Sequence, residues 1–149
     1  MNAYQPIEIL FIEDNPHEAE LTIRSLKKHN LANTLKHIDD GAEALDFIFA
    51  TGVYADREFS PNPKLIILDL KLPKIDGLEI LRKIKSDQRT QSIPVAVLTS
   101  SKEEKDIIES YKLGVNSYIV KPVNFESFSK AIAELGLYWI ILNQSPHSL

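Results

Sequence analysis

Short apolar runs alternate with segments of helical periodicity along the whole chain, and this alternation constrains the fold more than any other feature. Apolar residues recur three or four positions apart between the runs, as in Ala19, Ile23 and Leu26. A strand–helix unit repeated five times predicts an α/β fold, a (βα)5 doubly wound sheet of five parallel strands with helices on both faces. The expected strands are residues 7–12, 34–38, 64–69, 94–99 and 116–120.

The composition is that of a globular protein with one domain. The pattern uses all of residues 1–149, so we expect one domain and no separate output domain. A net charge of −4 without a basic block argues against a nucleic-acid partner, and the lack of cysteine excludes thiolate metal sites. The N-terminus does not resemble a signal peptide, and the longest apolar stretch, 137–142, is too short to span a membrane. These features predict a cytoplasmic protein with no membrane partner.

Polar residues follow the predicted strands where an apolar strand needs none. Glu13 and Asp14 follow the first strand, Asp69 ends the third, Thr99 ends the fourth and Lys121 follows the fifth. The carboxyl ends of parallel strands meet at one edge of the sheet, where ligands of such folds bind. We therefore expect three carboxylates, a hydroxyl and an ammonium group to lie close together.

A single acidic residue after a strand is most simply read as a helix cap, and either Asp14 or Asn15 could cap the helix that begins near Pro16. Capping does not explain the whole set. Carboxylates packed together repel one another, so they need either a hard divalent cation such as Mg²⁺ or a fixed cation such as Lys121.

The same residues could bind a phosphoryl group that is attached reversibly. A carboxylate can attack phosphorus to form an acyl phosphate, and Asp69 is the candidate nucleophile. Mg²⁺, Thr99 and Lys121 would then bind the phosphoryl oxygens.

Four segments resemble the receiver domains of two-component response regulators, which have the flavodoxin-like fold: "ILFIEDN", "LIILDLKLPKIDGLEIL", "IPVAVLTSS" and "GVNSYIVKP". The resemblance implies that Asp69 accepts a phosphoryl group from a histidine kinase and that Lys121 pairs with that group. It also implies a switch made by Thr99 and Tyr118, and a cis peptide before Pro122. The implied Mg²⁺ ligands are Glu13, Asp14, Asp69 and the backbone carbonyl of Lys71.

In more detail the chain resembles regulators that are partnered with phytochrome kinases. That resemblance implies a homodimer through the fourth helix, fifth strand and fifth helix, and a downstream protein target. The last helix is expected to be amphipathic, through Phe125, Phe128, Ile132 and Leu135, and then apolar all round. Its surplus apolar surface would cover either the end of the core or a partner.

Lys71 departs from the family pattern, because relatives commonly carry an amide or another polar residue two positions after the phosphoacceptor. Its side chain is expected to bring positive charge to the mouth of the pocket. The segment 50–64 is expected to be a surface loop, either a tolerated insertion or an interaction site.

Three alternatives stay open. The domain could be an interaction module that works without phosphorylation, although Asp69, Thr99 and Lys121 are intact. A Mg²⁺-dependent aspartyl phosphatase would want a second acid at position 71, where the chain has lysine. A flavin-binding module would want a phosphate loop after the first strand, where this chain is acidic. The expectation is therefore a signalling protein with self-catalysed phosphotransfer and slow autodephosphorylation, rather than an enzyme.

Overall fold

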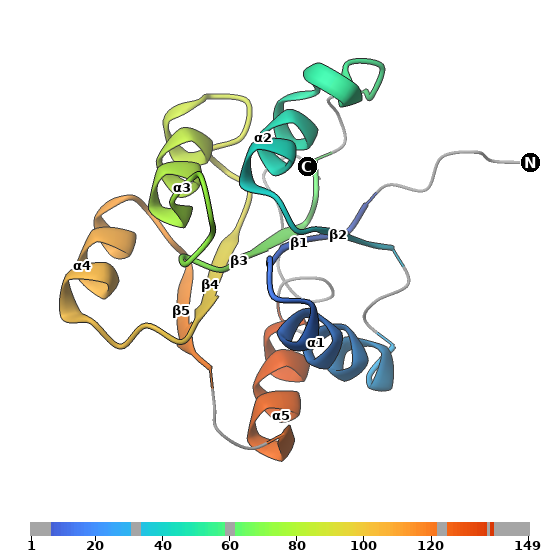
Figure 1. The fold of residues 1–149 in the computed structure, drawn as a ribbon, viewed down its shortest axis with the longest axis vertical. Helices are drawn as coiled ribbons and strands as arrows, with labels where there is room; N and C mark the ends of the chain where they lie inside the picture. Colours follow the sequence, from blue (N-terminus) through green and yellow to red (C-terminus); the bar gives the residue numbers. More distant parts are fainter. Residues whose placement is uncertain (1–6, 31–33, 59–61, 122–124, 137, 139–149) are drawn as a thin grey trace, which may run out of the picture.

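The fold is a parallel sheet between two layers of helices (Figure 1). The computed structural model describes residues 7–30, 34–58, 62–121, 125–136 and 138. The sheet order is β2-β1-β3-β4-β5, with β1 (Ile9–Ile12), β2 (Leu35–Ile38), β3 (Leu65–Leu68), β4 (Val95–Thr99) and β5 (Ser117–Val120), all parallel. The helices are α1 (Pro16–Lys28), α2 (Gly41–Phe49), α3 (Gly77–Ser86), α4 (Glu104–Lys112) and α5 (Phe125–Gly136). The predicted fold class is confirmed, and the strands differ from prediction by one or two residues at their ends.

Some expectations fall outside the described residues. They are the apolar stretch 137–142 apart from Tyr138, the peptide before Pro122 and the side chains of Phe125, Phe128 and Ile132. Of the helices that are described, none is both long enough and apolar enough to cross a membrane.

Two apolar layers hold the central strands, one on each face of the sheet. In β3, Ile66 and Leu68 join the cluster under α2 and α3, whereas Leu65 and Ile67 join the cluster that includes residues of α1 and α5. All four residues of β3 are buried, as expected for a parallel strand covered on both faces. This packing fixes the position at which β3 ends, and therefore the position of Asp69.

Helix caps separate structural from functional polar residues. The Asn15 side chain accepts hydrogen bonds from the backbone N–H groups of His17 and Glu18 at 3.0 and 3.1 Å, so Asn15 caps α1 and leaves Asp14 available. In the same way α3 is capped by Asp76, whose carboxylate accepts from the Leu78 N–H, and not by Asp69.

The described part of the segment 50–64 is fastened to α2 rather than free on the surface. A short 3₁₀ helix, η1 (Gly52–Tyr54), brings the Tyr54 ring edge-on to Phe47, with ring centroids 5.1 Å apart. The Tyr54 hydroxyl donates to Glu43 at 2.6 Å, and the Arg57 guanidinium lies 4.3 Å from the centroid of the Phe47 ring. Most described residues of the segment are exposed, as predicted for a surface loop, and the contacts of Tyr54 and Arg57 fasten it to the helix before it.

Gly77 marks the closest approach between α3 and the end of β3. A β-carbon at this position would lie 2.5 Å from both the backbone oxygen of Asp69 and the α-carbon of Leu70. The Gly77 N–H also donates to the Leu70 carbonyl at 3.1 Å. The first residue of α3 therefore has to lack a side chain if Asp69 is to keep its position.

We predict that Gly77→Ala lowers the free energy of unfolding by about 1 to 3 kcal/mol, because the new methyl group meets backbone atoms that cannot rotate away. Urea denaturation measures this change. Gly41→Ala is the matched control, since Gly41 also begins a helix after an aspartate cap, but its nearest neighbour is the tip of the Ile80 side chain at 3.0 Å. Equal losses in the two variants would contradict the steric argument.

Candidate functional site

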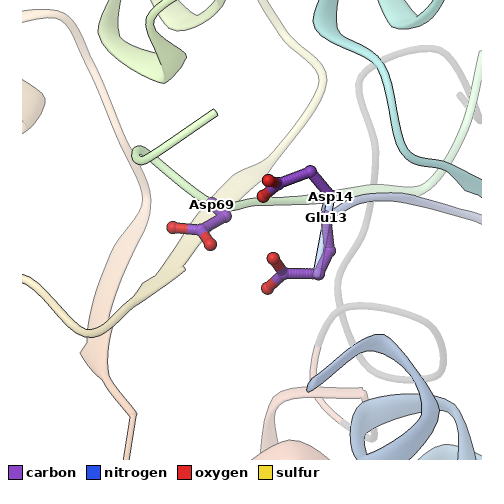
Figure 2. Close-up of side chains that lie close together, drawn as sticks. All are labelled: Glu13, Asp14 and Asp69. Carbon is purple, nitrogen blue, oxygen red and sulfur yellow. The ribbon is translucent and has the colours of Figure 1, made fainter. Parts of the chain in front are cut away.

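Three carboxylates converge at the carboxyl edge of the sheet. Figure 2 shows Glu13 and Asp14, from the end of β1, beside Asp69, from the end of β3. One carboxylate oxygen from each residue lies within 4.8 Å of the other two. Glu13 and Asp69 are buried and Asp14 is more exposed, so the group forms a pocket that opens to solvent on one side. The predicted acidic residues are thus brought together.

Lys121, which follows the edge strand β5, supplies the positive charge. Its Nζ lies 2.7 Å from Glu13 Oε1, 3.3 Å from Asp69 Oδ2 and 3.1 Å from Glu18 Oε2. The Lys121 backbone N–H donates to the Thr99 carbonyl at 2.8 Å, which fixes the start of the side chain. Sequence reasoning placed Lys121 at this edge but missed Glu18. Glu18 could have been found from the sequence, because it lies in the first turn of α1, a few residues after Glu13 and Asp14.

The charges in the pocket do not balance within the protein. Burial raises the pKa of Glu13 to about 7, although the hydrogen bond from Lys121 opposes the shift. Burial also disfavours the charge on Lys121, but its contacts with Glu13 and Asp69 outweigh this and raise its pKa. Three carboxylates face one close ammonium group, so the pocket favours either a proton on Glu13 or an additional cation.

Backbone contacts hold the acidic side chains in place. The Asn15 N–H donates to Glu13 Oε2 at 3.2 Å, and the Lys71 N–H donates to Asp69 Oδ1 at 3.1 Å. His37 is on β2, and its Nε2 lies 2.8 Å from the backbone carbonyl oxygen of Glu13. Because a carbonyl oxygen can only accept a hydrogen bond, Nε2 carries the proton. His37 was also missed, because nothing in the sequence marks which residue of an edge strand reaches the next strand's carbonyl.

Thr99 and Tyr118 meet at the same edge through one backbone segment. Thr99 is fully buried, and its hydroxyl oxygen accepts from the Ser101 N–H at 3.4 Å. The half-buried Tyr118 donates its hydroxyl hydrogen to the Ser101 carbonyl at 3.0 Å. The two predicted switch residues are therefore linked through Ser101.

The Lys71 side chain does not lie where it was expected. Its Nζ lies 3.4 Å from Asp106 Oδ2 on α4, so its charge is directed toward that helix rather than toward the carboxylate pocket. The predicted role of the Lys71 carbonyl as a metal ligand stays a prediction.

The donor set fits a hard divalent cation. All three converging groups offer carboxylate oxygen, the ligand type that Mg²⁺ prefers, and the open side of the pocket leaves room for water ligands. Lys121 already binds one oxygen of Glu13 at 2.7 Å and one oxygen of Asp69 at 3.3 Å, so Asp14 is the most available of the three ligands.

A family model described as the response regulator receiver domain matches residues 9–133. The chain belongs to this family. It is 36% identical over 146 residues to the probable methanogenesis regulatory protein FilR2 of Methanothrix harundinacea, covering 98% of this chain and 92% of FilR2. It is 39% identical over 135 residues to the response regulator Rcp1 of Synechocystis, covering 91% of this chain and 90% of Rcp1.

Solved structures agree with this assignment. The crystal structure of Mn²⁺-bound Rcp1 superimposes with a TM-score of 0.84 at 38% identity, covering 95% of this chain and 99% of that one. The phosphorylated cyanobacterial phytochrome response regulator RcpA superimposes with the same score at 35% identity, with the same coverage of both chains. The predicted likeness to single-domain regulators associated with phytochromes is therefore confirmed.

We predict that Mg²⁺ raises the melting temperature by about 5 to 10 °C at about 100 times its dissociation constant, because it binds the folded pocket and relieves repulsion between carboxylates. Thermal unfolding with and without Mg²⁺ measures the shift, and chelation should reverse it. Asp14→Asn should remove most of it. Glu20→Gln, which changes an exposed acid on α1 paired with Arg24, is the control and should leave the shift intact. A full shift in Asp14→Asn would rule out this pocket as the site.

Proposed function

We propose that this chain is a stand-alone response regulator that works in the cytoplasm as a phosphorylation-dependent switch, with Asp69 as its phosphoacceptor. The observation that carries the proposal is the contact of Lys121 with both Asp69 and Glu13 beside the carboxylate of Asp14. An interaction module without phosphorylation chemistry has no need for a buried, charge-imbalanced pocket of this kind.

The chemistry follows from the contacts of Asp69. The Lys71 N–H binds Oδ1 and Lys121 binds Oδ2, so the carboxylate is oriented before the reaction. A carboxylate oxygen attacks the phosphorus of a phosphohistidine, a P–O bond forms, and the P–N bond to the histidine breaks. The Lys121 ammonium and the Thr99 hydroxyl then bind phosphoryl oxygens. Asp14, Asp69, the Lys71 carbonyl and Glu13 would hold a Mg²⁺ ion, which would supply further positive charge to the phosphoryl oxygens.

The signal leaves through Thr99 and Tyr118. A phosphoryl group extends further than the Asp69 carboxylate, so its oxygens offer the Thr99 hydroxyl a charge-assisted hydrogen bond within reach. Movement of Thr99 toward it disturbs the contact with the Ser101 N–H, and Ser101 also holds the Tyr118 hydroxyl. Thr99 and Tyr118 therefore form a two-state element that one new charge can bias.

We predict that the wild type gains the mass of one phosphoryl group when it is incubated with acetyl phosphate and Mg²⁺, and that Asp69→Asn gains none, because an amide is a poor nucleophile. Intact mass spectrometry gives the measurement. Asp56→Asn, an exposed aspartate near η1, is the matched control and should be modified like the wild type. Equal uptake by Asp69→Asn would refute the assignment of the phosphoacceptor.

The proposed physiological donor is a phytochrome-type histidine kinase, and the similarity to RcpA supports this choice. The same mass measurement, with a phosphorylated phytochrome kinase in place of acetyl phosphate, tests it. FilR2 is about as similar and has a methanogenesis role in its name, so a non-phytochrome kinase is the comparison donor.

The proposed partner surface is a homodimer contact through α4, β5 and α5. Ile108 and Tyr111 lie one helical turn apart on α4, and they are 46% and 53% exposed. All four residues of β5 are half-buried, as expected for an edge strand that its own helices cover only partly. This surface lies next to Tyr118, so the switch and the dimer contact are adjacent.

We predict that Tyr111→Glu weakens self-association by at least about tenfold, because a charge replaces an aromatic contact in the interface. Sedimentation velocity over a range of protein concentrations measures the change. Val53→Glu is the matched control, since Val53 is 83% exposed on η1, away from this surface. A wild type that stays monomeric at all concentrations would exclude the dimer.

A further inference from the structure

A buried carboxylate in the first turn of α4 is not used by the chemistry proposed above. Asp106 is only 6% exposed, and its Oδ2 accepts a hydrogen bond from the Ser101 hydroxyl at 2.6 Å. The same oxygen lies 3.4 Å from Lys71 Nζ. We call Lys71, Asp106 and Ser101 the Asp106 latch.

The latch is connected to the phosphorylation pocket at both ends. The Lys71 N–H donates to Asp69 Oδ1, and the Ser101 N–H donates to the Thr99 hydroxyl oxygen. The contact through Lys71 reaches Asp69 itself, whereas the contact through Ser101 reaches Thr99, another residue of the same pocket. The route through Lys71 ends on a side chain whose partner can change.

The two halves of the latch differ in strength. The Ser101–Asp106 hydrogen bond is buried, and it is the main reason why the pKa of Asp106 is lowered. The Lys71 side chain is 57% exposed. An ion pair that is so exposed to water is weak, and another anion can replace the partner of its lysine. Lys71 is thus the part of the latch that a stronger anion can remove.

Phosphorylation of Asp69 would create such an anion nearby. Lys121 already contacts three carboxylates, so it has limited capacity to balance a new dianionic group. The Lys71 side chain is not packed in place, because it lines an open pocket of about 370 Å³ beside α3 and α4. The other lining residues are Asp76, Leu78, Lys105, Asp106 and Glu109.

We propose that Lys71 is a positioning residue that exchanges partners: it holds Asp106 and the first turn of α4 before phosphorylation, and it moves to the phosphoryl group afterwards. This inference rests on the proposed function and deepens it, since it names the side chain that carries the charge at Asp69 to α4. Asp106 then keeps only Ser101, and a buried carboxylate that loses its cation loosens the helix start.

Amide hydrogen exchange measured by NMR tests both states of the latch. The Asp106 and Ile107 N–H groups both donate to the Glu103 carbonyl, at 3.1 and 3.2 Å, so their exchange reports opening of this first turn. Without phosphorylation, Lys71→Met should exchange about two- to fivefold faster than the wild type at these two amides. Lys105→Met is the matched control and should change exchange much less than Lys71→Met, because Lys105 lines the same pocket but pairs with the exposed Glu103 and acts on Asp106 more weakly than Lys71 does. Lys71→Arg should retain the wild-type protection.

Beryllofluoride with Mg²⁺, a stable mimic of the phosphoryl group, probes the second state. It should speed exchange in the wild type by a similar factor and add little in Lys71→Met. Wild-type protection in untreated Lys71→Met would overturn the inference. Unchanged exchange in the treated wild type would also overturn the inference. If intact mass then shows that the wild type takes up phosphate from acetyl phosphate, the proposed function would still stand. A wild type that takes up no phosphate would overturn both.

Discussion

The reach of Lys121 across the sheet is the interaction on which the site depends. Lys121 follows β5, yet its ammonium group contacts Asp69 at the end of β3 and Glu13 at the end of β1. Neighbouring strands are about 4.8 Å apart, so only a long side chain that crosses the end of β4 can make both contacts. Without this cation, two buried carboxylates would face each other in a medium that opposes their charge.

The carboxylates at the end of the sheet stay close together only if the apolar core holds the strand ends rigidly. The aliphatic side chains on both faces of β1 and β3 hold the strand ends rigidly, and this rigidity keeps the like charges at a fixed separation. The same packing brings Thr99, Ser101 and Tyr118 within one hydrogen-bonded segment. In a chain with a looser core, the carboxylates would move apart and relieve the repulsion, and the pocket would not form.

The fold and the centre of the site were predictable because both follow from local rules. Residue periodicity predicts the elements, and the parallel topology brings Glu13, Asp14, Asp69 and Lys121 to one edge. The choice of Asn15 over Asp14 as the helix cap was not predictable, since both residues can cap and the backbone geometry decides. Glu18, His37 and Asp106 were missed for another reason. Their contacts depend on how a helix or an edge strand packs against the sheet, and the direction of Lys71 depends on Asp106 in the same way.

The segment 50–64, which is fastened to α2, can vary in sequence without affecting the carboxylate pocket. Its described part, 50–58 and 62–64, begins at the carboxyl end of α2 and ends at the amino end of β3, which is the edge of the sheet opposite the carboxylates. The contacts of Tyr54 and Arg57 with Phe47 and Glu43 anchor its first turn to a helix that is already held by the core. New sequence inserted after this anchor changes the outer surface without displacing a strand end. The molecule thus has a region whose sequence can vary without disturbing the carboxylate pocket.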